Sequence, residues 1–162
     1  MATRDFTIAI IVDQDPEAVY HAINNVRGWW SEEITGDTDR KNGVFDYHYK
    51  DLHTCRIKVT ELVPGSIVAW KVLDNQFKFT QSKTEWIGNP IVFEITDVGG
   101  QTRLQFTHVG LVPGIECYEI CRDAWTNYIT ESLKTLIETG EGDPIRKTGN
   151  AFQEVIEERV DG

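Results

Sequence analysis

The feature that most constrains the fold is an apolar pattern near the carboxyl end of the chain, between Pro113 and Gly140. Its apolar residues recur at intervals of three and four, which places them on one broad helical face. Proline is tolerated in the first turn of a helix and glycine commonly follows the last turn, so these two residues mark its expected ends. The pattern predicts one long helix that buries Ile120, Cys121, Ala124, Trp125, Tyr128, Ile129, Ser132, Leu133, Leu136 and Ile137.

Upstream of this helix, apolar and polar residues alternate in short runs, as they do in strands with one buried face. Asp15 and Pro16 have the residue types of a helix cap and a first helical position, which predicts a short helix ending near residue 25. Residues 31–43 indicate a loop, and the Gly99–Gly100 pair indicates a hairpin. The predicted strands lie near 6–12, 44–50, 53–60, 68–72, 77–79, 91–95 and 104–108.

This order of elements predicts an α+β fold in which one long helix packs across one sheet. A chain of 162 residues has the length of a single domain, which we place at residues 1–140. Curvature between the two layers can leave a cavity. Residues 141–162 form an extension, for which two interpretations stay open: it docks on its own domain or on a second subunit, or it is a disordered tail. Its apolar residues have the spacing of a short amphipathic helix: Phe152, Val155, Ile156 and Val160.

The charge of the chain argues against two classes of partner. Sixteen Lys and Arg against 26 Asp and Glu give a formal charge of −10, and a field of that sign repels nucleic-acid phosphates and anionic membranes. The sequence has no run of about 20 apolar residues, and residues 1–5 lack the pattern of a secretion signal. Three cysteines indicate free thiols in a reducing compartment. We expect a cytoplasmic protein without nucleic-acid or membrane partners.

Several short strings follow one another along residues 5–140: Asp15-Pro16-Glu17, Arg27-Gly28-Trp29-Trp30, Thr84-Glu85-Trp86, Phe93-Glu94-Ile95, Phe106-Thr107-His108 and Trp125. In this order they resemble the helix-grip (SRPBCC) superfamily of START lipid-transfer domains, the birch pollen allergen and bacterial polyketide cyclases. Within it, the chain is most similar to the branch of the heat-shock-protein-ninety ATPase activator homologue carboxy-terminal domain. The resemblance implies a curved antiparallel sheet of about seven strands around one long carboxy-terminal helix, with short helices after the first strand and a pocket between sheet and helix.

The alternation within each strand and the helical face together indicate which residues line such a pocket. Most of them are aromatic and a few have polar tips, which is the composition of a small-molecule site and also that of an ordinary core. Trp86 is a further ring able to stack on a ligand, and Trp30 lies near the expected mouth. The predicted ligand-binding residues are Trp30, Tyr47, His53, Cys55, Trp70, Phe79, Trp86, Phe93, Phe106, His108, Cys117, Cys121, Trp125 and Tyr128.

Two histidines occupy inward positions of the predicted strands. His53 and His108 could act as general acid or base there, orient a carbonyl group or bind a metal, although a structural histidine is the more common outcome. Tyr47 is the third catalytic candidate. The three cysteines lack the closely spaced pairs of structural zinc sites, so we expect no metal, and the sequence indicates no cofactor.

Three functions therefore remain open. The first is binding of a small hydrophobic or aromatic ligand in a cavity between the sheet and the helix. The second is a polyketide cyclase-like or hydrolase-like enzyme that uses His53 or His108 as acid or base. The third is a cochaperone similar to the ATPase activator, acting through its outer surface. A homodimer is compatible with all three. The sequence contains no nucleophile elbow and no phosphate-binding glycine loop.

Overall fold

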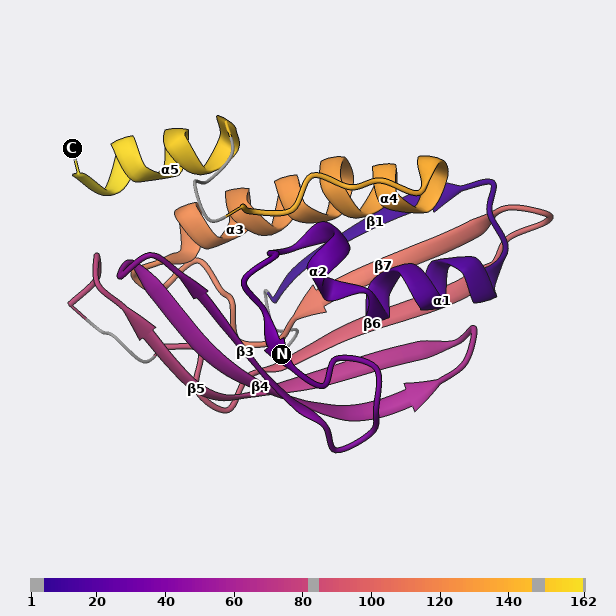
Figure 1. Cartoon of the computed structure of the whole chain (residues 1–162), viewed down its shortest axis with the longest axis horizontal. Helices are drawn as coiled ribbons and strands as arrows, with labels where there is room; N and C mark the ends of the chain where they lie inside the picture. Colours follow the sequence, from indigo (N-terminus) through magenta and orange to yellow (C-terminus); the bar gives the residue numbers. More distant parts are fainter. Residues whose placement is uncertain (1–4, 82–84, 147–150, 162) are drawn as a thin grey trace.

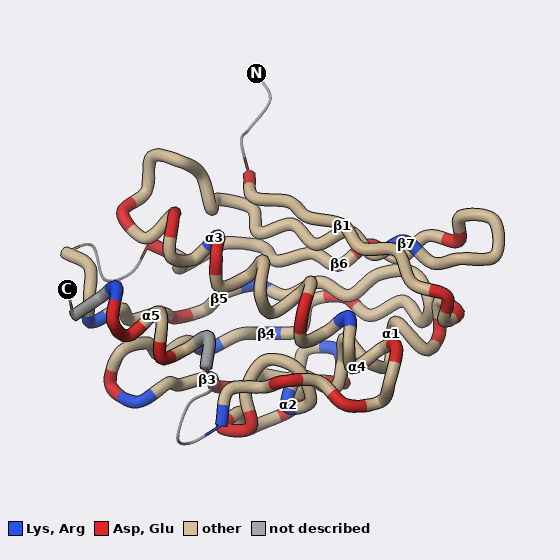
Figure 2. Tube along the Cα trace, turned by 90° about the horizontal axis from the view of Figure 1, so that it is seen from above, with Lys and Arg blue, Asp and Glu red and all other residues tan. Residues whose placement is uncertain are grey.

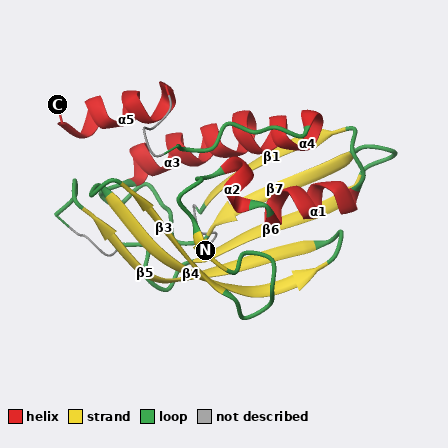
Figure 3. Ribbon diagram, viewed as in Figure 1, coloured by secondary structure: helices red, strands yellow, loops and turns green. Residues whose placement is uncertain are grey.

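The computed structural model describes residues 5–81, 85–146 and 151–161, and it forms one curved antiparallel sheet with helices on its concave side (Figure 1, Figure 3). The order of the strands across the sheet is β1-β7-β6-β5-β4-β3-β2. The predicted helix-grip fold is confirmed. The strands are β1 (Phe6–Val12), β2 (Thr35–Gly36), β3 (Val44–Tyr49), β4 (His53–Val63), β5 (Ile67–Phe77), β6 (Pro90–Asp97) and β7 (Thr102–His108).

Two short helices, α1 (Pro16–Asn24) and α2 (Val26–Trp29), follow the first strand. The side chain of Asp15 accepts a hydrogen bond from the Ala18 amide at 2.8 Å, so Asp15 caps α1 as predicted. The bonded cap satisfies an amide that the helix itself leaves without a partner. Residues 26–29, which the sequence left outside any helix, add the short turn of α2.

The long helix comprises α3 (Tyr118–Asn127), a π-helical turn η1 (Tyr128–Leu133) and α4 (Lys134–Thr139). Gly140 ends it in the left-handed conformation with φ 87°, as the sequence predicts. Its predicted start at Pro113 is wrong, because residues 113–117 form turns and the helix begins at Tyr118. The Glu85 carboxylate accepts hydrogen bonds from the amides of residues 116 and 117 and so occupies the donors at that end.

Two strand predictions also need correction. The expected separate strand at 77–79 does not form, because β5 extends as far as Phe77 and the chain then bends. The seventh strand is the two-residue β2, which lies inside the predicted loop and pairs with Phe45 and Asp46 of β3. The hairpin at Gly99–Gly100 joins β6 to β7 as predicted, and both glycines have positive φ.

Stacked rings fill the space between the sheet and the helices α1, α2 and α4. Trp29 lies parallel to Trp70, with ring centroids 6.3 Å apart, and Trp70 meets Phe93 edge-on at 4.8 Å. All three are buried, and the indole N–H of Trp29 donates to the Ile23 carbonyl at 3.0 Å. We call these residues, Ile23, Trp29, Trp70 and Phe93, the packed half of the interior.

A further helix, α5 (Ala151–Asp161), lies beside α3 at the other half of the molecule (Figure 1). It falls within the extension that the sequence separates from residues 1–140, and the division into these two parts stays a prediction. Thr84, residues 1–4, and the side chains of Phe152 and Val160 lie outside the described residues.

Acidic residues occur along most elements of the chain (Figure 2). Over the described residues, no helix combines the length and the apolar character that crossing a membrane requires.

Candidate functional site

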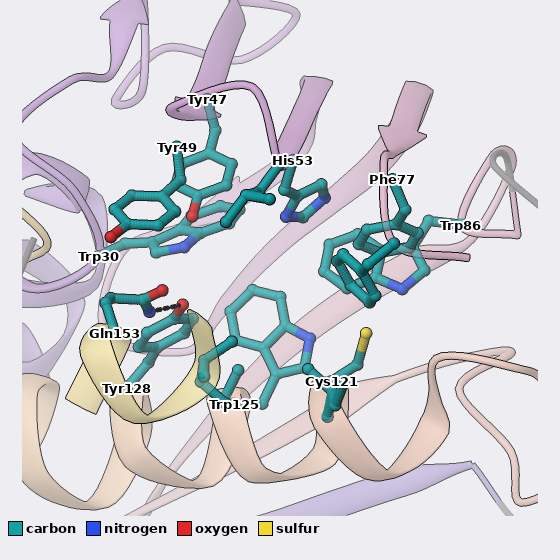
Figure 4. Close-up of a pocket in the computed structure, with 15 residues that line it drawn as sticks. Trp30, Tyr47, Tyr49, His53, Phe77, Trp86, Cys121, Trp125, Tyr128 and Gln153 are labelled. Atoms are coloured by element: carbon teal, nitrogen blue, oxygen red, sulfur yellow. Dashed lines mark hydrogen bonds between the residues drawn. The ribbon is translucent and has the colours of Figure 1, made fainter. Parts of the chain in front are cut away.

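A pocket opens between the sheet and α3, next to α5, in the half of the interior away from Trp29 and Phe93 (Figure 4). The strands β3, β4 and β5 supply one wall, α3 and η1 supply the floor, and α5 supplies two residues. The lining residues are Trp30, Tyr47, Tyr49, Leu52, His53, Phe77, Phe79, Trp86, Ile120, Cys121, Ala124, Trp125, Tyr128, Gln153 and Ile156.

The hollow has a volume of about 50 Å³. Roughly 10–15 Å³ accommodates one water molecule, whereas an engineered cavity of about 150 Å³ binds benzene. The pocket therefore has room for a few water molecules in this state. A ligand with an aromatic ring requires at least one lining residue to move.

Aromatic rings form most of the wall. Trp30 stacks on Tyr47 with centroids 4.4 Å apart and planes 21° from parallel. Trp86 stacks on Trp125 at 5.8 Å and 18°. Flat rings offer large apolar area and favour other rings in offset or edge-to-face contact. These walls suit a flat, apolar molecule.

Two tyrosine hydroxyls form a polar end of the pocket. The hydroxyls of Tyr47 and Tyr128 are hydrogen-bonded to each other, and Gln153 Nε2 donates to Tyr128 Oη at 2.6 Å (Figure 4). Burial raises the pKa of both tyrosines well above the usual value of 10. Both hydroxyls therefore remain protonated at neutral pH, and Tyr47 is a poor general base.

His53 contributes a neutral imidazole to the same pocket. Its Nε2 lies 2.7 Å from Asn75 Oδ1, so Nε2 carries the proton and Nδ1 is the acceptor of the ring. Burial lowers the pKa of His53 to about 4. At neutral pH the ring can accept a hydrogen bond but carries no positive charge.

His108 is fully buried behind the pocket wall, and both of its ring nitrogens are occupied. Trp125 Nε1 donates to His108 Nδ1 at 3.1 Å, so Nε2 carries the proton and faces Asn89 Oδ1 at 3.0 Å. Burial lowers the pKa of His108 to about 3. His108 does not line the pocket, but its hydrogen bond orients the ring of Trp125, which does.

Helix α5 covers the pocket. Gln153 and Ile156 are buried against it, and the side chain of Glu157 bonds to Lys50 Nζ at 2.6 Å and to the Tyr49 hydroxyl. Hydrogen bonds from these two groups lower the pKa of Glu157. Arg159, two residues further along α5, pairs with the α3 carboxylate of Asp123 at 2.8 Å. Polar contacts at its edge thus hold α5 over an apolar interior.

The structure brings together part of the predicted binding set. The pocket is lined by Trp30, Tyr47, His53, Phe79, Trp86, Cys121, Trp125 and Tyr128. The other predicted residues lie elsewhere: Trp70, Phe93, Phe106, His108, Cys55 and Cys117. The rings of Trp70, Phe93 and Phe106 pack against one another within the sheet–helix core. Cys55 borders an outer groove with Asp46, Arg56 and Asp74, and Cys117 is the cap residue of α3.

Seven lining residues were not among the predicted set: Tyr49, Leu52, Phe77, Ile120, Ala124, Gln153 and Ile156. Tyr49 and Phe77 occupy inward positions of their strands, and Ile120 and Ala124 lie on the apolar face of the helix. The sequence patterns that indicated the other lining residues therefore indicate these four as well. Gln153 is polar and more than one hundred residues from Tyr49 in sequence, and no local pattern indicates its place.

The three cysteines are buried free thiols. Burial raises the pKa of Cys55 and of Cys121 well above the usual value, so neither is a thiolate at neutral pH. Across the part of the chain that the structure describes, no three His, Cys, Asp or Glu side chains are grouped as a metal site requires.

The sequence model of the family described as Activator of Hsp90 ATPase homolog 1-like protein matches residues 13–138. The chain belongs to this family. The match ends before α5, so the cover of the pocket lies outside the family segment. No curated protein matches the sequence.

Solved structures share the fold. The Aha1 dimer from Colwellia psychrerythraea is 23% identical, covers 88% of this chain and 100% of its own, and has a TM-score of 0.69. CalU16 from Micromonospora echinospora is 14% identical, covers 97% of this chain and 84% of its own, and has a TM-score of 0.62. DynU16, from the dynemicin biosynthetic locus, is 14% identical, covers 87% of this chain and 49% of its own, and has a TM-score of 0.61. At these identities the likeness concerns the fold.

Proposed function

We propose that the protein binds a small, apolar, flat molecule in the pocket between the sheet and α3, next to α5. The observation that carries this proposal is a hollow enclosed mainly by aromatic rings, at the place where helix-grip folds enclose space between sheet and helix. The ionisable groups that face the pocket, which include Tyr47, His53 and Tyr128, are neutral at pH 7. An uncharged lining favours an uncharged guest, because a buried charge without a partner is costly.

The ligand enters by displacing α5. The closed hollow of about 50 Å³ is smaller than an aromatic ring requires. Gln153 and Ile156 are the lining residues that belong to a separate helix. That helix is held by the buried hydrogen bond from Gln153 to Tyr128 and by exposed or half-exposed ion pairs of Glu157 and Arg159. Such ion pairs contribute only about 0–1 kcal/mol each. Opening at α5 therefore costs less than opening at the sheet.

Titration with the neutral fluorescent probe N-phenyl-1-naphthylamine tests the proposal. We expect saturable binding with one site per chain. Ala124→Phe adds a ring inside the pocket and should weaken binding at least about tenfold, because overlapping volumes exclude each other. Ala9→Phe adds the same ring on the exposed face of β1 and is the matched control. Unsaturable binding, or equal affinities in the two variants, contradicts the proposal.

Acid–base catalysis has less support from the site. A general base works best with a pKa near the operating pH, whereas the pKa of His53 is about 4 and that of His108 about 3. Both nitrogens of His108 also have partners in the folded protein. The predicted cyclase-like or hydrolase-like activity would rest on His53 alone.

Family membership favours a second candidate, a cochaperone that stimulates a chaperone ATPase. Its test is the ATPase rate of the Hsp90-type chaperone from the same host with and without the purified protein. The Colwellia Aha1 structure is a dimer; a homodimer stays a prediction for this chain and can be tested by light scattering.

A further inference from the structure

The indole N–H of Trp30 is a buried donor that has no hydrogen-bond partner among the described residues. The side chain is 1% exposed, and its ring is held by stacking on Tyr47 and by contact with Trp125 at 5.1 Å. In Figure 4 the nitrogen lies on the ring edge that faces the space above Trp125 and Tyr128. A buried donor left without an acceptor costs roughly 1–3 kcal/mol. The Trp30 N–H therefore lacks an acceptor that a bound ligand could supply.

The other polar groups of the pocket are better satisfied. Tyr128 has both Gln153 and Tyr47 as partners, and His53 is bonded to Asn75. The N–H of Trp86 faces the sulfur of Cys121, which is a weak acceptor. The group that a guest would satisfy most strongly is thus the donor of Trp30.

The charge of the lining determines what kind of acceptor can bind there. None of the lining residues, all within the described ranges, is a Lys, Arg, Asp or Glu. A carboxylate or phosphate placed against Trp30 would be buried without a cation, which is strongly unfavourable. A ketone, ester or amide carbonyl pairs with the N–H and adds no charge.

We propose that Trp30 donates its indole N–H to a neutral carbonyl oxygen carried by an otherwise apolar, flat ligand. This inference rests on the proposed function and specifies the ligand class of the same pocket. The ring of Trp30 then has two roles. Its face contributes stacking area, and its edge selects ligands that place an acceptor beside it.

Three naphthalene probes with the same ring system test the inference in the full-length protein. 2-Acetylnaphthalene carries the carbonyl, 2-isopropenylnaphthalene replaces the oxygen with a CH₂ group of similar shape, and 2-naphthoate carries a charge. The measured quantity is the ratio of the affinities of the first two probes. Trp30→Phe retains an aromatic face and removes the donor, so we expect it to lower this ratio about five- to tenfold. A general loss of affinity affects both probes and cancels in the ratio.

Trp70→Phe is the matched control. Trp70 is also 1% exposed and its Nε1 also has no partner in the described part of the chain, but its ring lies outside the pocket lining. Its ring stacks on Trp30 with centroids 6.1 Å apart, so this variant also measures how much a disturbed packing of Trp30, without loss of the Trp30 donor, changes the ratio. The affinity ratio should stay within about twofold of wild type in this variant. An equal fall of the ratio in both variants contradicts a specific role for Trp30.

A second measurement does not depend on the variants' folding. In ¹⁵N-labelled wild-type protein, the Trp30 Nε1–H resonance should move downfield and exchange more slowly on addition of 2-acetylnaphthalene, and should change less with the isopropenyl probe. Equal shifts with both probes overturn the carbonyl assignment and leave the proposed function intact. Tighter binding of 2-naphthoate contradicts both, because the proposed guest is uncharged. If none of the probes binds, both the assignment and the proposed function fail.

Discussion

Trp29 and Trp30 are neighbours in sequence, yet they belong to two different halves of the interior. Trp29 stacks on Trp70 in the packed half, and its indole N–H is bonded to the Ile23 carbonyl. Trp30 also stacks on Trp70, with centroids 6.1 Å apart, but it borders the other half as well, where it lines the pocket and has no acceptor among the described residues. Both rings are buried to the same degree. Burial alone therefore does not separate core from site. An unsatisfied donor does not separate them either, because Trp70 Nε1 in the packed half also has no partner among the described residues. The adjoining hollow is what distinguishes Trp30.

The largest contrast between the halves should appear in stability. Phe93→Ala removes a fully buried ring surrounded by other rings and should lower the free energy of unfolding by about 3–5 kcal/mol. Phe77→Ala removes a ring that already borders the hollow, so fewer contacts are lost, and we expect a loss about 1–2 kcal/mol smaller. Urea unfolding measures both. Equal losses would mean that the two halves are equally well packed.

The two histidines should make stability depend on pH. Burial holds their pKa values at about 4 for His53 and about 3 for His108, against 6.5 for an exposed histidine. Between pH 6.5 and 5 the unfolded chain binds protons that the folded chain does not, so stability falls as the pH falls. For each histidine the slope rises from about 0.7 kcal/mol per pH unit at pH 6.5 to about 1.4 kcal/mol per pH unit near pH 5.

Urea unfolding at several pH values between 5 and 6.5 checks this slope, since most carboxylates remain ionised there. His53→Gln and His108→Gln should each remove about half of the histidine contribution. His53 faces the pocket, and of these two histidines it should titrate first in NMR spectra as the pH falls, near pH 4. A slope that neither substitution changes would show that the rings are exposed to water in solution.

The smallest expected effect concerns the cover. Glu157→Lys replaces the ion pair with Lys50 by a repulsion and removes the bond to Tyr49, so α5 should open more often. We expect N-phenyl-1-naphthylamine to associate about three- to fivefold faster, measured by stopped-flow fluorescence, with stability changed by less than about 1 kcal/mol.

The double variant Lys50→Glu/Glu157→Lys recreates the pair with reversed charges and should restore most of the slow association. Asp37→Lys breaks an exposed ion pair with Arg40 outside the pocket lining, changes the net charge in the same direction and by the same amount as Glu157→Lys, and serves as the control. If the control accelerates association as much as Glu157→Lys does, the effect is one of net charge and α5 is not the gate.

Much of the fold could be predicted from the sequence because it depends on local patterns. Alternation placed Tyr47, His53 and Phe93 on inward faces, and the helix stop at Gly140 is a local signal as well. The start of the long helix could not be predicted, because Glu85, some thirty residues earlier, bonds to the amides at that end.

The pocket was harder to predict than the fold. Trp70 and His53 both occupy inward-facing positions of their strands, yet Trp70 belongs to the packed half and His53 lines the pocket. Which half of the interior is hollow depends on how rings from distant segments stack. The partners of the histidines, Asn75 and Asn89, and the position of Gln153 against Tyr128 arise only from tertiary contacts. Sequence patterns along one strand or helix contain no information on such pairs.

A crystal structure of the full-length protein with bound 2-acetylnaphthalene tests the central claim most directly. We predict electron density for the probe among Trp30, Trp86 and Trp125, with its oxygen within about 3 Å of Trp30 Nε1 and with Gln153 and Ile156 moved out of the pocket. Density for the probe only on the outer surface, with the hollow and α5 unchanged, would contradict the account.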